Sequence, residues 1–569
     1  MRLVGGGDRE ALPATPLWRD PRRDESSERT LSSSAVSMRV FPKEQDLEEV
    51  TAFDGPNDAR STGETPTLPP PEHDQTASGL ERPPRHRLTV IAAAVGLGAL
   101  LFTPLILSSL DREQHADAGE PAPNELSSSS EREHQATLPE PLPEADELGG
   151  GDPCTRSDKP VVELSGEIET DATLHCDRNY LLRFQARVTE GATLTIEPGT
   201  TVLGDLETKG TLIVEPGARL IADGTRERPI VFTSSQAPER RRPGSWGGIV
   251  ILGEAPINLR DAEGRPIRGR VEGLVSGGSY GGDDPEDDSG VLRHVRIEYP
   301  GVEIAPANEL NGLTLAGVGR GTLLDYVQVR ATTDDCFEFF GGTVDGKHLV
   351  CDDPGDDGFD FDFGYQGRLQ FLVVRDHRGS SDPGDAGDGP SNAFEFDNDP
   401  AGAGVEPRTR PQIWNATSCG STGVPSKHGP SYGMLVRRAA SPELHAVLFA
   451  GFDFALDLRD AGTSLTLTDL GLIGLPGAES DERDDDNGFD ELAWLADPAR
   501  GLISDIEGFT GCSTPPPTGM RPAVPVPAAI APPDDGFFDP EARWLGAFAG
   551  PEDHWADPAE AGAPSWIVW

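Results

Sequence analysis

Acidic residues set between phenylalanines are the part of this sequence best suited to chemistry. Two triplets of the form Phe-acid-Phe occur at Phe337–Phe339 and Phe359–Phe361. The acids of these triplets and their neighbours make up a candidate ligand-binding set: Glu338, Asp360, Asp362 and Glu395. Calcium prefers such oxygen ligands and takes about six to eight of them. One interpretation is a calcium or ligand surface, and the other is solvated acids outside an apolar core.

A second candidate set, for a metal ion, lies just before the second triplet. Its members are Asp352, Asp353, Asp356 and Asp357. Their spacing does not match an EF-hand loop, because a glycine stands at the third position of Asp353–Gly358. Tight turns also use aspartate and glycine, so turn formation is the alternative to a calcium site. A further oxygen-rich loop contains Asp382, Asp385 and Asp388.

A carbohydrate-cleaving enzyme is the main alternative to a binding protein. The run Asp334-Asp335-Cys336 is superficially similar to the Asp-Asp-Cys of polygalacturonases, which hydrolyse glycosides with paired carboxylates. The Gly-His and Arg-x-Lys elements of those enzymes are missing here. A lyase would need a basic residue beside calcium, and Arg375 and Arg378 are available, but nothing in the sequence selects them.

The acids must be positioned by a repeating fold, because the triplets recur after 22 residues, from Phe337 to Phe359. Short runs of Val, Ile, Leu and Phe alternate with Gly, Asp and Pro, which predicts strands and turns. The 67 Gly and 52 Pro of the chain exclude a helical solenoid. The sequence therefore predicts an all-β solenoid of stacked coils.

Stacking in register predicts which side chains lie above one another. Parallel coils are about 4.8 Å apart, so Phe337 should stack on Phe359 and Phe339 on Phe361. Glu338 and Asp360 should then stack on the opposite face of the same strands. The same triplet pattern recurs at Phe394–Phe396 and Phe452–Phe454.

The charge and the cysteines limit the classes of function. A net charge of -49 excludes general nucleic-acid binding, since phosphates would be repelled. It suits a secreted protein or one that binds divalent cations. The six cysteines form no Cys-x-x-Cys pair, which disfavours zinc and thioredoxin-type sites. Disulfides between neighbours along the chain are the simplest pairing, and free thiols are the alternative: Cys154–Cys176, Cys336–Cys351 and Cys419–Cys512.

The first part of the chain predicts a membrane anchor. Residues 1–87 are polar and mixed in charge, which is typical of disorder. Leu88–Leu110 is an uncharged apolar run long enough to span a bilayer, with basic residues before it and acidic ones after it. The positive-inside rule then puts residues 1–87 in the cytoplasm and the rest outside. A cleaved signal peptide is the alternative, and residues 111–152 are predicted to be an acidic linker rich in Pro and Ser.

The globular part is predicted to have two segments. Residues 153–513 should form the solenoid, and residues 514–569 a Pro/Ala-rich tether with a capping segment. We expect the tryptophans of this last segment to cap the open end of the solenoid, which must be covered to prevent edge pairing. If they were exposed instead, they could stack on sugars. These residues are Trp544, Trp555, Trp566 and Trp569.

Several motifs together resemble a known family. They include Gly244–Gly253, Ser289–Tyr299, Phe337–Val344 and Asp356–Gly364. In combination they are similar to a family of bacterial exported proteins, known mostly as lipoproteins or secreted proteins of unknown activity. The resemblance covers about residues 160–569. It implies a right-handed parallel β-helix of the pectate-lyase-like type and no particular catalytic residues. The membrane anchor in place of a lipoprotein signal is a departure from the family.

These observations lead to one expected function and one alternative. We expect a membrane-anchored protein of the bacterial cell envelope, in the inner membrane with its β-helix in the periplasm or outside the cell. Its role would be binding, adhesion or structure without catalysis, with calcium as the candidate cofactor. The expected partners are the membrane and a polysaccharide or envelope protein. The alternative is a polysaccharide lyase or hydrolase of the pectate-lyase-like class.

Overall fold

The computed structural model describes nine ranges of the chain. They are 152–274, 277–305, 308–376, 392–399, 404–420, 430–474, 489–511, 517–560 and 562–569. The predicted disordered segment, the predicted membrane span 88–110 and the predicted linker up to residue 151 lie outside the described residues. So do Asp382, Asp385, Asp388 and Cys512. No helix within the described ranges is long and apolar enough to cross a membrane.

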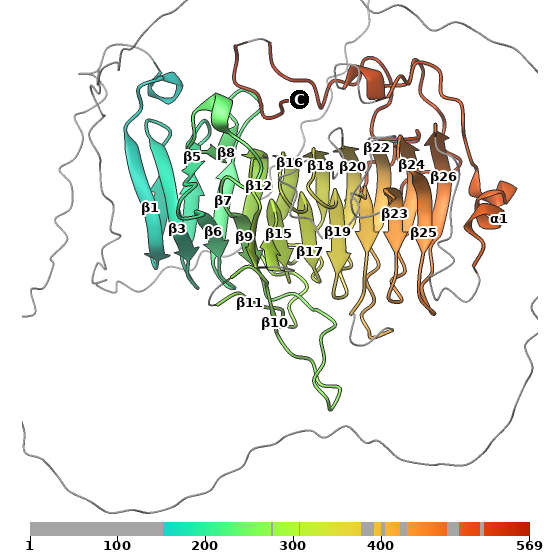
Figure 1. The fold of residues 1–569 in the computed structure, drawn as a ribbon, viewed down its shortest axis with the longest axis horizontal. Coiled ribbons are helices and arrows are strands. Elements are labelled where there is room, and N and C mark those ends of the chain that lie inside the picture. Colours follow the sequence, from blue (N-terminus) through green and yellow to red (C-terminus); the bar gives the residue numbers. More distant parts are fainter. Residues whose placement is uncertain are drawn as a thin grey trace, which may run out of the picture. The chain divides into compact units, whose positions relative to one another are not determined.

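The described residues form a parallel β-helix, as predicted. Twenty-two strands join into one continuous sheet that winds through successive coils (Figure 1). One face of each coil, here called the ladder face, is built from short strands that pair in parallel with the coils before and after. These strands are β6 (Thr211–Val214), β9 (Gly248–Leu252), β15 (Leu313–Ala316), β17 (Phe337–Phe340), β19 (Phe359–Asp362), β21 (Phe394–Phe396), β23 (Tyr432–Val436) and β25 (Phe454–Leu458).

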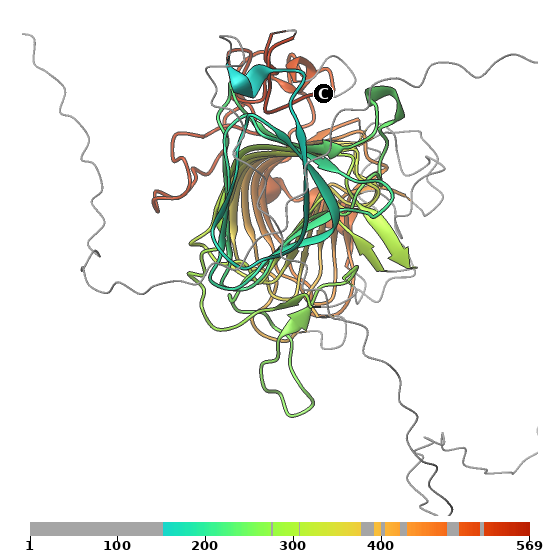
Figure 2. The same ribbon diagram turned by 90° about the vertical axis from the view of Figure 1, so that its left-hand side faces the viewer.

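The other faces are made mainly by long strands that bend in the middle. Viewed along the stack, the coils superimpose (Figure 2). The long strands are β1 (Val161–Ile168), β3 (Asn179–Val188), β12 (Gly290–Glu298), β16 (Leu323–Arg330), β18 (Gly346–Asp352), β20 (Arg368–Arg375), β22 (Gln412–Cys419), β24 (Glu443–Ala450) and β26 (Thr466–Ile473). Shorter strands replace some of them in the early coils: β2 (Ala172–Leu174), β4 (Thr193–Ile196), β5 (Thr201–Gly204), β7 (Arg219–Asp223) and β8 (Ile230–Ser234).

A few short strands and helices lie outside the main sheet. Two antiparallel hairpins extend from the early coils, and they are formed by β10 (Gly269–Arg270) with β11 (Ser279–Tyr280) and by β13 (Val302–Ala305) with β14 (Asn308–Leu310). One short helix, α1 (Glu491–Leu495), follows the last coil. The single-turn 3₁₀ segments are η2 (Pro153–Thr155), η3 (Pro238–Arg240), η4 (Pro498–Arg500) and η5 (Thr518–Met520).

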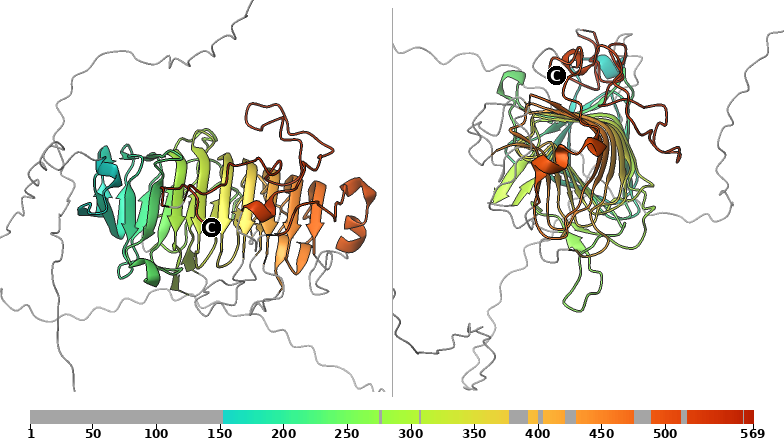
Figure 3. Two further views of the ribbon diagram at one scale, coloured as in Figure 1. Left: turned by 90° about the horizontal axis from the view of Figure 1, so that it is seen from above. Right: turned by 90° about the vertical axis from the view of Figure 1, so that its right-hand side faces the viewer.

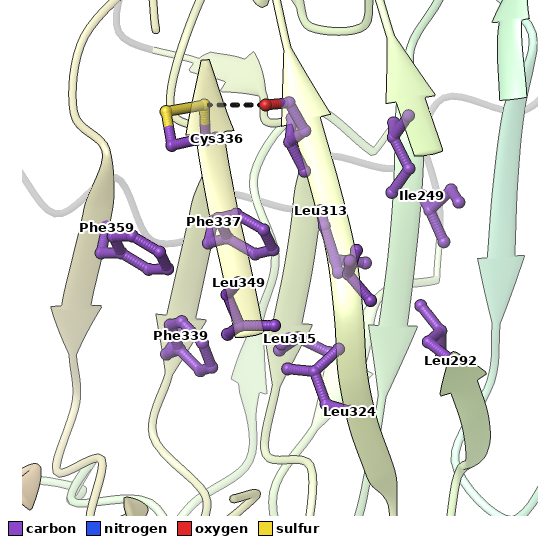
Figure 4. Close-up of a cluster of buried hydrophobic side chains, with 14 of the residues drawn as sticks. Ile249, Leu292, Leu313, Leu315, Leu324, Cys336, Phe337, Phe339, Leu349 and Phe359 are labelled. Atoms are coloured by element: carbon purple, nitrogen blue, oxygen red, sulfur yellow. Dashed lines mark hydrogen bonds between the residues drawn. A yellow bond between two sulfur atoms is a disulfide. The ribbon is translucent and has the colours of Figure 1, made fainter. Parts of the chain in front are cut away.

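Stacked phenylalanine rings fill the interior behind the ladder face. The rings of Phe337 and Phe359 lie 4.8 Å apart, and those of Phe339 and Phe361 lie 5.0 Å apart, which confirms the predicted stacking. The next coil continues both columns with Phe394 and Phe396. All six rings are fully buried. Figure 4 shows Phe337, Phe339 and Phe359 beside the leucines of neighbouring coils.

The fourth predicted triplet, Phe452–Phe454, does not continue these columns. Met434 pairs with Phe394, and Leu456 pairs with Met434 in turn. The residues in register with the triplets are therefore Leu456–Leu458, four positions further along the chain. A pattern of three residues cannot distinguish this shift, because the register depends on the length of the turn between coils.

The residues at the bend of the long strands form a second column of stacked side chains. Residues with positive φ stand at this bend in seven successive strands, and they are His294, Tyr326, His348, Phe371, Asn415, Ala446 and Asp469. The first four rings stack on the outer surface, with centroid separations between 4.1 and 4.9 Å. Left-handed backbone is uncommon outside glycine, so its repetition marks a corner that every coil needs.

The C-terminal segment lies along this corner and does not cap the open end as predicted. Trp566 packs edge-on against Tyr326, and Trp555 packs edge-on against His348. The amides of Gln328, Gln370 and Asn415 hold the passing backbone through hydrogen bonds to residues 539–568. Figure 3 shows the segment crossing several coils, while α1 lies at the end of the stack. Leu495 of α1 joins the core there, so this short helix covers the last coil.

The disulfides agree with the predicted pairing as far as the structure describes them. Cys154 is bonded to Cys176, and Cys336 is bonded to Cys351. Cys419 is also disulfide-bonded, and none of the described cysteines is free. The alternative of buried free thiols is therefore wrong for the described part of the chain.

The phenylalanine columns predict a large stability loss on truncation. Phe359→Ala should lower the free energy of unfolding by about 3–5 kcal/mol, because it leaves a cavity between two stacked rings. Phe537→Ala is the control, since that half-buried ring lies outside the core and should cost about 1 kcal/mol. Denaturant titration measures both losses. Equal losses in the two variants would contradict the role of the columns.

Candidate functional site

The outer side of the ladder face carries a column of acids produced by the register. Glu338 pairs with Asp360, and Asp360 pairs with Glu395 in the next coil. Their side chains therefore point to the same side, as the sequence predicted for the first two. Asp362 stands two residues further along β19 and Asp397 directly follows β21, and they form a second acidic column beside the first.

The turns that lead into these strands add four more acids. Asp334 and Asp335 precede β17, and Asp356 and Asp357 precede β19 in the equivalent turn. The turns are bonded to one another: the backbone N–H of Asp357 donates to Asp335 Oδ1 at 2.8 Å. The backbone N–H of Asn392 donates in the same way to Asp357 Oδ1 at 2.7 Å. One carboxylate oxygen in each turn thus holds the next coil in place.

Asp335 joins the turn acids to the strand acids. One carboxylate oxygen from each of Asp335, Glu338 and Asp360 lies within 4.8 Å of the other two. One oxygen from each of Asp334, Asp335 and Asp356 forms a second such group. These five residues are called the carboxylate cluster below. Two ligands of one calcium ion, each about 2.3–2.6 Å from it, are at most about 5 Å apart. The spacing therefore fits a shared calcium ion.

Two acids of the cluster are buried and the other three are half-buried, unlike the solvated acids of the simpler interpretation. Asp335 is 7% exposed and Glu338 is 5% exposed. Burial, and then the charge of Asp334, raises the pKa of Asp335 well above its ordinary value. Burial and Asp335 do the same to the pKa of Glu338, and burial and Asp362 to the pKa of Asp360. The acids cannot all be ionised without a compensating charge.

Hydrogen bonding within the cluster is incomplete. The side-chain amide of Asn311 donates to Glu338 Oε2. In contrast, Asp360 Oδ1 and Asp362 Oδ1 are shielded from solvent and have no hydrogen-bond partner. A buried carboxylate oxygen without a donor is costly, and a bound cation would satisfy it.

Two arginines neutralise the far end of the acidic columns. The guanidinium of Arg437 donates to Glu395, and through Nε to Asp397 Oδ1 at 2.7 Å. Arg438 donates to the other oxygen of Asp397. The pKa of Asp397 is nevertheless raised to about 6, mainly by burial and then by the charge of Glu395. Glu395, one of the predicted ligands, thus forms an ion pair with Arg437. The ion pairs of Arg437 with described residues do not include Glu338 or Asp360.

The predicted metal set is divided between two places. Asp356 belongs to the carboxylate cluster, and Asp357 lies beside it. Asp352 is fully buried between Arg330 and Arg375 at the end of β18, in an ion pair with each. Asp353 follows it with a positive φ, and its N–H donates to the carbonyl of Arg375. The chain turns between Asp353 and Asp356, which the dense acidic sequence does not reveal.

Three members of the site were in neither predicted set, although Asp334 and Asp335 belong to the run that is similar to a hydrolase motif. Asp334 and Asp335 stand 22 residues before Asp356 and Asp357, so the repeat length itself places the four acids in one stack. Asn311 has no comparable signal, because it reaches Glu338 from the coil before.

The raised pKa values predict an unusual pH dependence. A carboxyl whose folded pKa exceeds its unfolded value of about 4 destabilises the native state as the pH rises between the two values. For Asp397 this window runs from about 4 to about 6. Burial, and then the charge of Asp362, raises the pKa of Asp360 in the same direction. Asp360→Asn should therefore raise the melting temperature of the calcium-free protein at about pH 7 and have little effect at about pH 4.

The matched control for this measurement is Asp283→Asn, at an exposed carboxylate away from the cluster. It should leave the melting temperature within experimental error at both pH values. A loss of stability in the Asp360 variant at neutral pH would show that its charge is stabilising and would contradict the described electrostatics.

Comparison with known proteins agrees with this architecture. Residues 166–474, more than half of the chain, match a family described as the pectate-lyase-like β-helix domain. A solved structure titled "Crystal structure of pectate lyase Pel9A" is 11% identical, over 66% of this chain and 88% of that chain, with a TM-score of 0.25. No curated protein matches the chain. By its family match, this chain belongs to the pectate-lyase-like β-helix domain family.

Proposed function

We propose that this protein binds acidic glycans at the bacterial cell envelope through calcium held by the carboxylate cluster. The observation that carries the proposal is the group formed by Asp335, Glu338 and Asp360. The apolar run at Leu88–Leu110 would anchor the chain in the inner membrane, with the β-helix outside the cytoplasm. The disulfides are consistent with an oxidising compartment.

The chemistry of the cluster favours calcium. The candidate ligands are carboxylates, which are hard oxygen donors. They are buried together with raised pKa values, so the cation would remove an electrostatic penalty that the protein otherwise meets by protonation. Asp360 Oδ1 is already without a hydrogen-bond partner.

A glycan is the ligand class that the family supports. The fold family includes proteins that act on or bind carbohydrates, and a linear polysaccharide suits a surface that repeats along one axis. The protein has a net charge of -49 and would repel an acidic polymer. A bound calcium ion inverts the local charge and can bridge the carboxylates of protein and glycan. With the cation bound, an acidic ligand would be attracted to this site rather than repelled.

A second candidate function, polysaccharide cleavage, is favoured by one observation. The acids Asp335, Glu338 and Asp360 form a group with strongly raised pKa values, and such groups gather at catalytic sites. A protonated carboxyl beside an ionised one is what glycoside hydrolysis uses. Binding remains the first proposal, because these acids belong to columns that repeat from coil to coil, as expected of a binding surface that extends along the stack.

The first test is thermal unfolding of the full-length protein in detergent, with calcium or after chelation. Calcium at about 100 times its dissociation constant should stabilise the native state by about 2.7 kcal/mol and raise the melting temperature. Glu338→Gln and Asp360→Asn should each remove most of this shift, and Asp283→Asn should keep it. An unchanged melting temperature in wild type on adding calcium would refute the calcium site.

Cleavage is tested separately with polygalacturonate and alginate, by assaying new reducing ends and unsaturated products. Our account predicts binding to the polymers without cleavage. Product formation that is lost in Asp335→Asn but kept in Asp283→Asn would replace the binding proposal with the enzymatic one.

A further inference from the structure

A pocket of about 660 Å³ opens on the early coils, at the opposite end of the ladder face from the arginine pair. The residues that line it from β1, β3 and the turn before β6 combine polar and charged groups with apolar surface: Glu167, Phe184, Gln185, Arg187, Thr208 and Lys209. Ile304 and Leu310 from the β13–β14 hairpin form part of its wall. Its volume is in the range of small-molecule sites, which are about 300–1,000 Å³.

The pocket is distinct from the carboxylate cluster. Arg187 and Glu338 are separated by four steps of the ladder register, through Ile213, Val250 and Thr314. Four steps correspond to about 19 Å along the stack. The space over Val250 is filled by a small apolar core that includes Leu310, so the hairpin separates the two sites.

Phe184 presents an exposed aromatic ring at this pocket. The residue is 59% exposed and has a positive φ of 52°, where β3 turns from one face to the next. Its backbone N–H donates to Thr208 Oγ1 at 3.0 Å, which fixes the turn. The positive φ belongs to the bend of β3, as it does in the other bent strands, so the fold accounts for it. The exposure of so large an apolar ring is the feature that suits contact with a ligand.

Lys209 contributes a positive charge that no acid neutralises among the described residues. Its ammonium is half-buried and donates to the carbonyl of Gly244 at 2.9 Å. Burial and then the charge of Arg242 lower its pKa, and no carboxylate is among the causes. In a chain with a net charge of -49, a cation left with a neutral partner is a feature that suits an anionic ligand.

The remaining lining offers both donors and acceptors. Arg187 is held by Glu215 and, through Nη2, by Gln185 Oε1 at 2.7 Å. The exposed carboxylate of Glu167 and the side chain of Thr208 lie on the same pocket. Sugar hydroxyls both donate and accept hydrogen bonds, and the faces of a sugar ring are apolar. A lining that combines polar groups with apolar surface therefore suits a sugar.

We propose that this pocket is a second subsite for an acidic glycan, in which a uronic acid stacks its ring on Phe184 and places its carboxylate at Lys209. The choice of glycan rests on the proposed function, whereas the pocket itself contains none of the calcium-binding acids. Unlike the carboxylate cluster, this subsite contacts the sugar directly and needs no cation.

The test is calorimetric titration of the full-length protein in detergent with hexamers of galacturonate and of mannuronate, and with their methyl esters. Chelated protein should still bind one of the acidic hexamers more tightly than its ester. Lys209→Met should weaken this calcium-independent binding by about tenfold or more, the usual effect of removing a charged hydrogen-bond partner. Phe184→Ala should also weaken it, because the sugar loses the ring on which it stacks.

Two control variants match these changes in exposure and chemistry. Lys159→Met removes another half-buried ammonium that donates to a glycine carbonyl, and Leu492→Ala removes a side chain that is also 59% exposed. Both should bind like wild type. The melting temperatures of all four variants show whether a loss of binding reflects a loss of fold.

The outcomes separate this inference from the calcium proposal. Tight binding that needs calcium and is unaffected by Phe184→Ala and Lys209→Met would overturn the pocket and leave the calcium site standing. Calcium-independent binding that these variants weaken would support the pocket even if calcium had no effect on the melting temperature. Equal affinity for acid and ester, or no binding of either hexamer to wild type, would overturn it.

Discussion

The in-register pairing of successive coils is the constraint on which the rest of this structure depends. Each residue of a ladder strand lies about 4.8 Å from its equivalent in the next coil, so every side chain is repeated as a column. Inside the fold this repetition is favourable, since Phe337, Phe359 and Phe394 stack ring on ring. Outside, the same register brings Glu338, Asp360 and Glu395 together.

Stacking stabilises the phenylalanine column, whereas charge repulsion destabilises the acidic column. Two unit charges about 5 Å apart repel each other by about 3 kcal/mol at an effective dielectric constant of about 20. A favourable cross-strand pair contributes only about 0.2–1 kcal/mol. Pairing alone therefore cannot hold three adjacent ionised acids. Arg437 relieves the repulsion at Glu395, and the cluster around Asp335 is left for protons or for a cation.

The repeat explains which features could be predicted from the sequence. Its 22-residue period was enough for the solenoid, for the stacking of the first two triplets and for Glu338 above Asp360. Features that depend on turn length were not accessible in this way. The shift at Phe452–Phe454 and the separation of Asp352 from Asp356 both arise where the chain leaves a strand, and neighbouring residues then diverge in space.

Contacts between distant segments were also beyond the sequence pattern. Trp566 packs on Tyr326 along the side of the coils, because the repeated left-handed corner exposes a stack of rings and amides that a passing segment can cover. The sequence showed the tryptophans but not the surface that receives them. In the same way, Asn311 and the pocket at Phe184 depend on which coil lies beside which.

The most direct measurement of the central claim is anomalous diffraction from crystals of the protein grown with calcium or terbium. Our account predicts a peak bound by oxygens of Asp335, Glu338 and Asp360, at about 2.3–2.6 Å from each for calcium. A structure in which these three carboxylates keep their described positions at saturating calcium, with no peak between them, would contradict it.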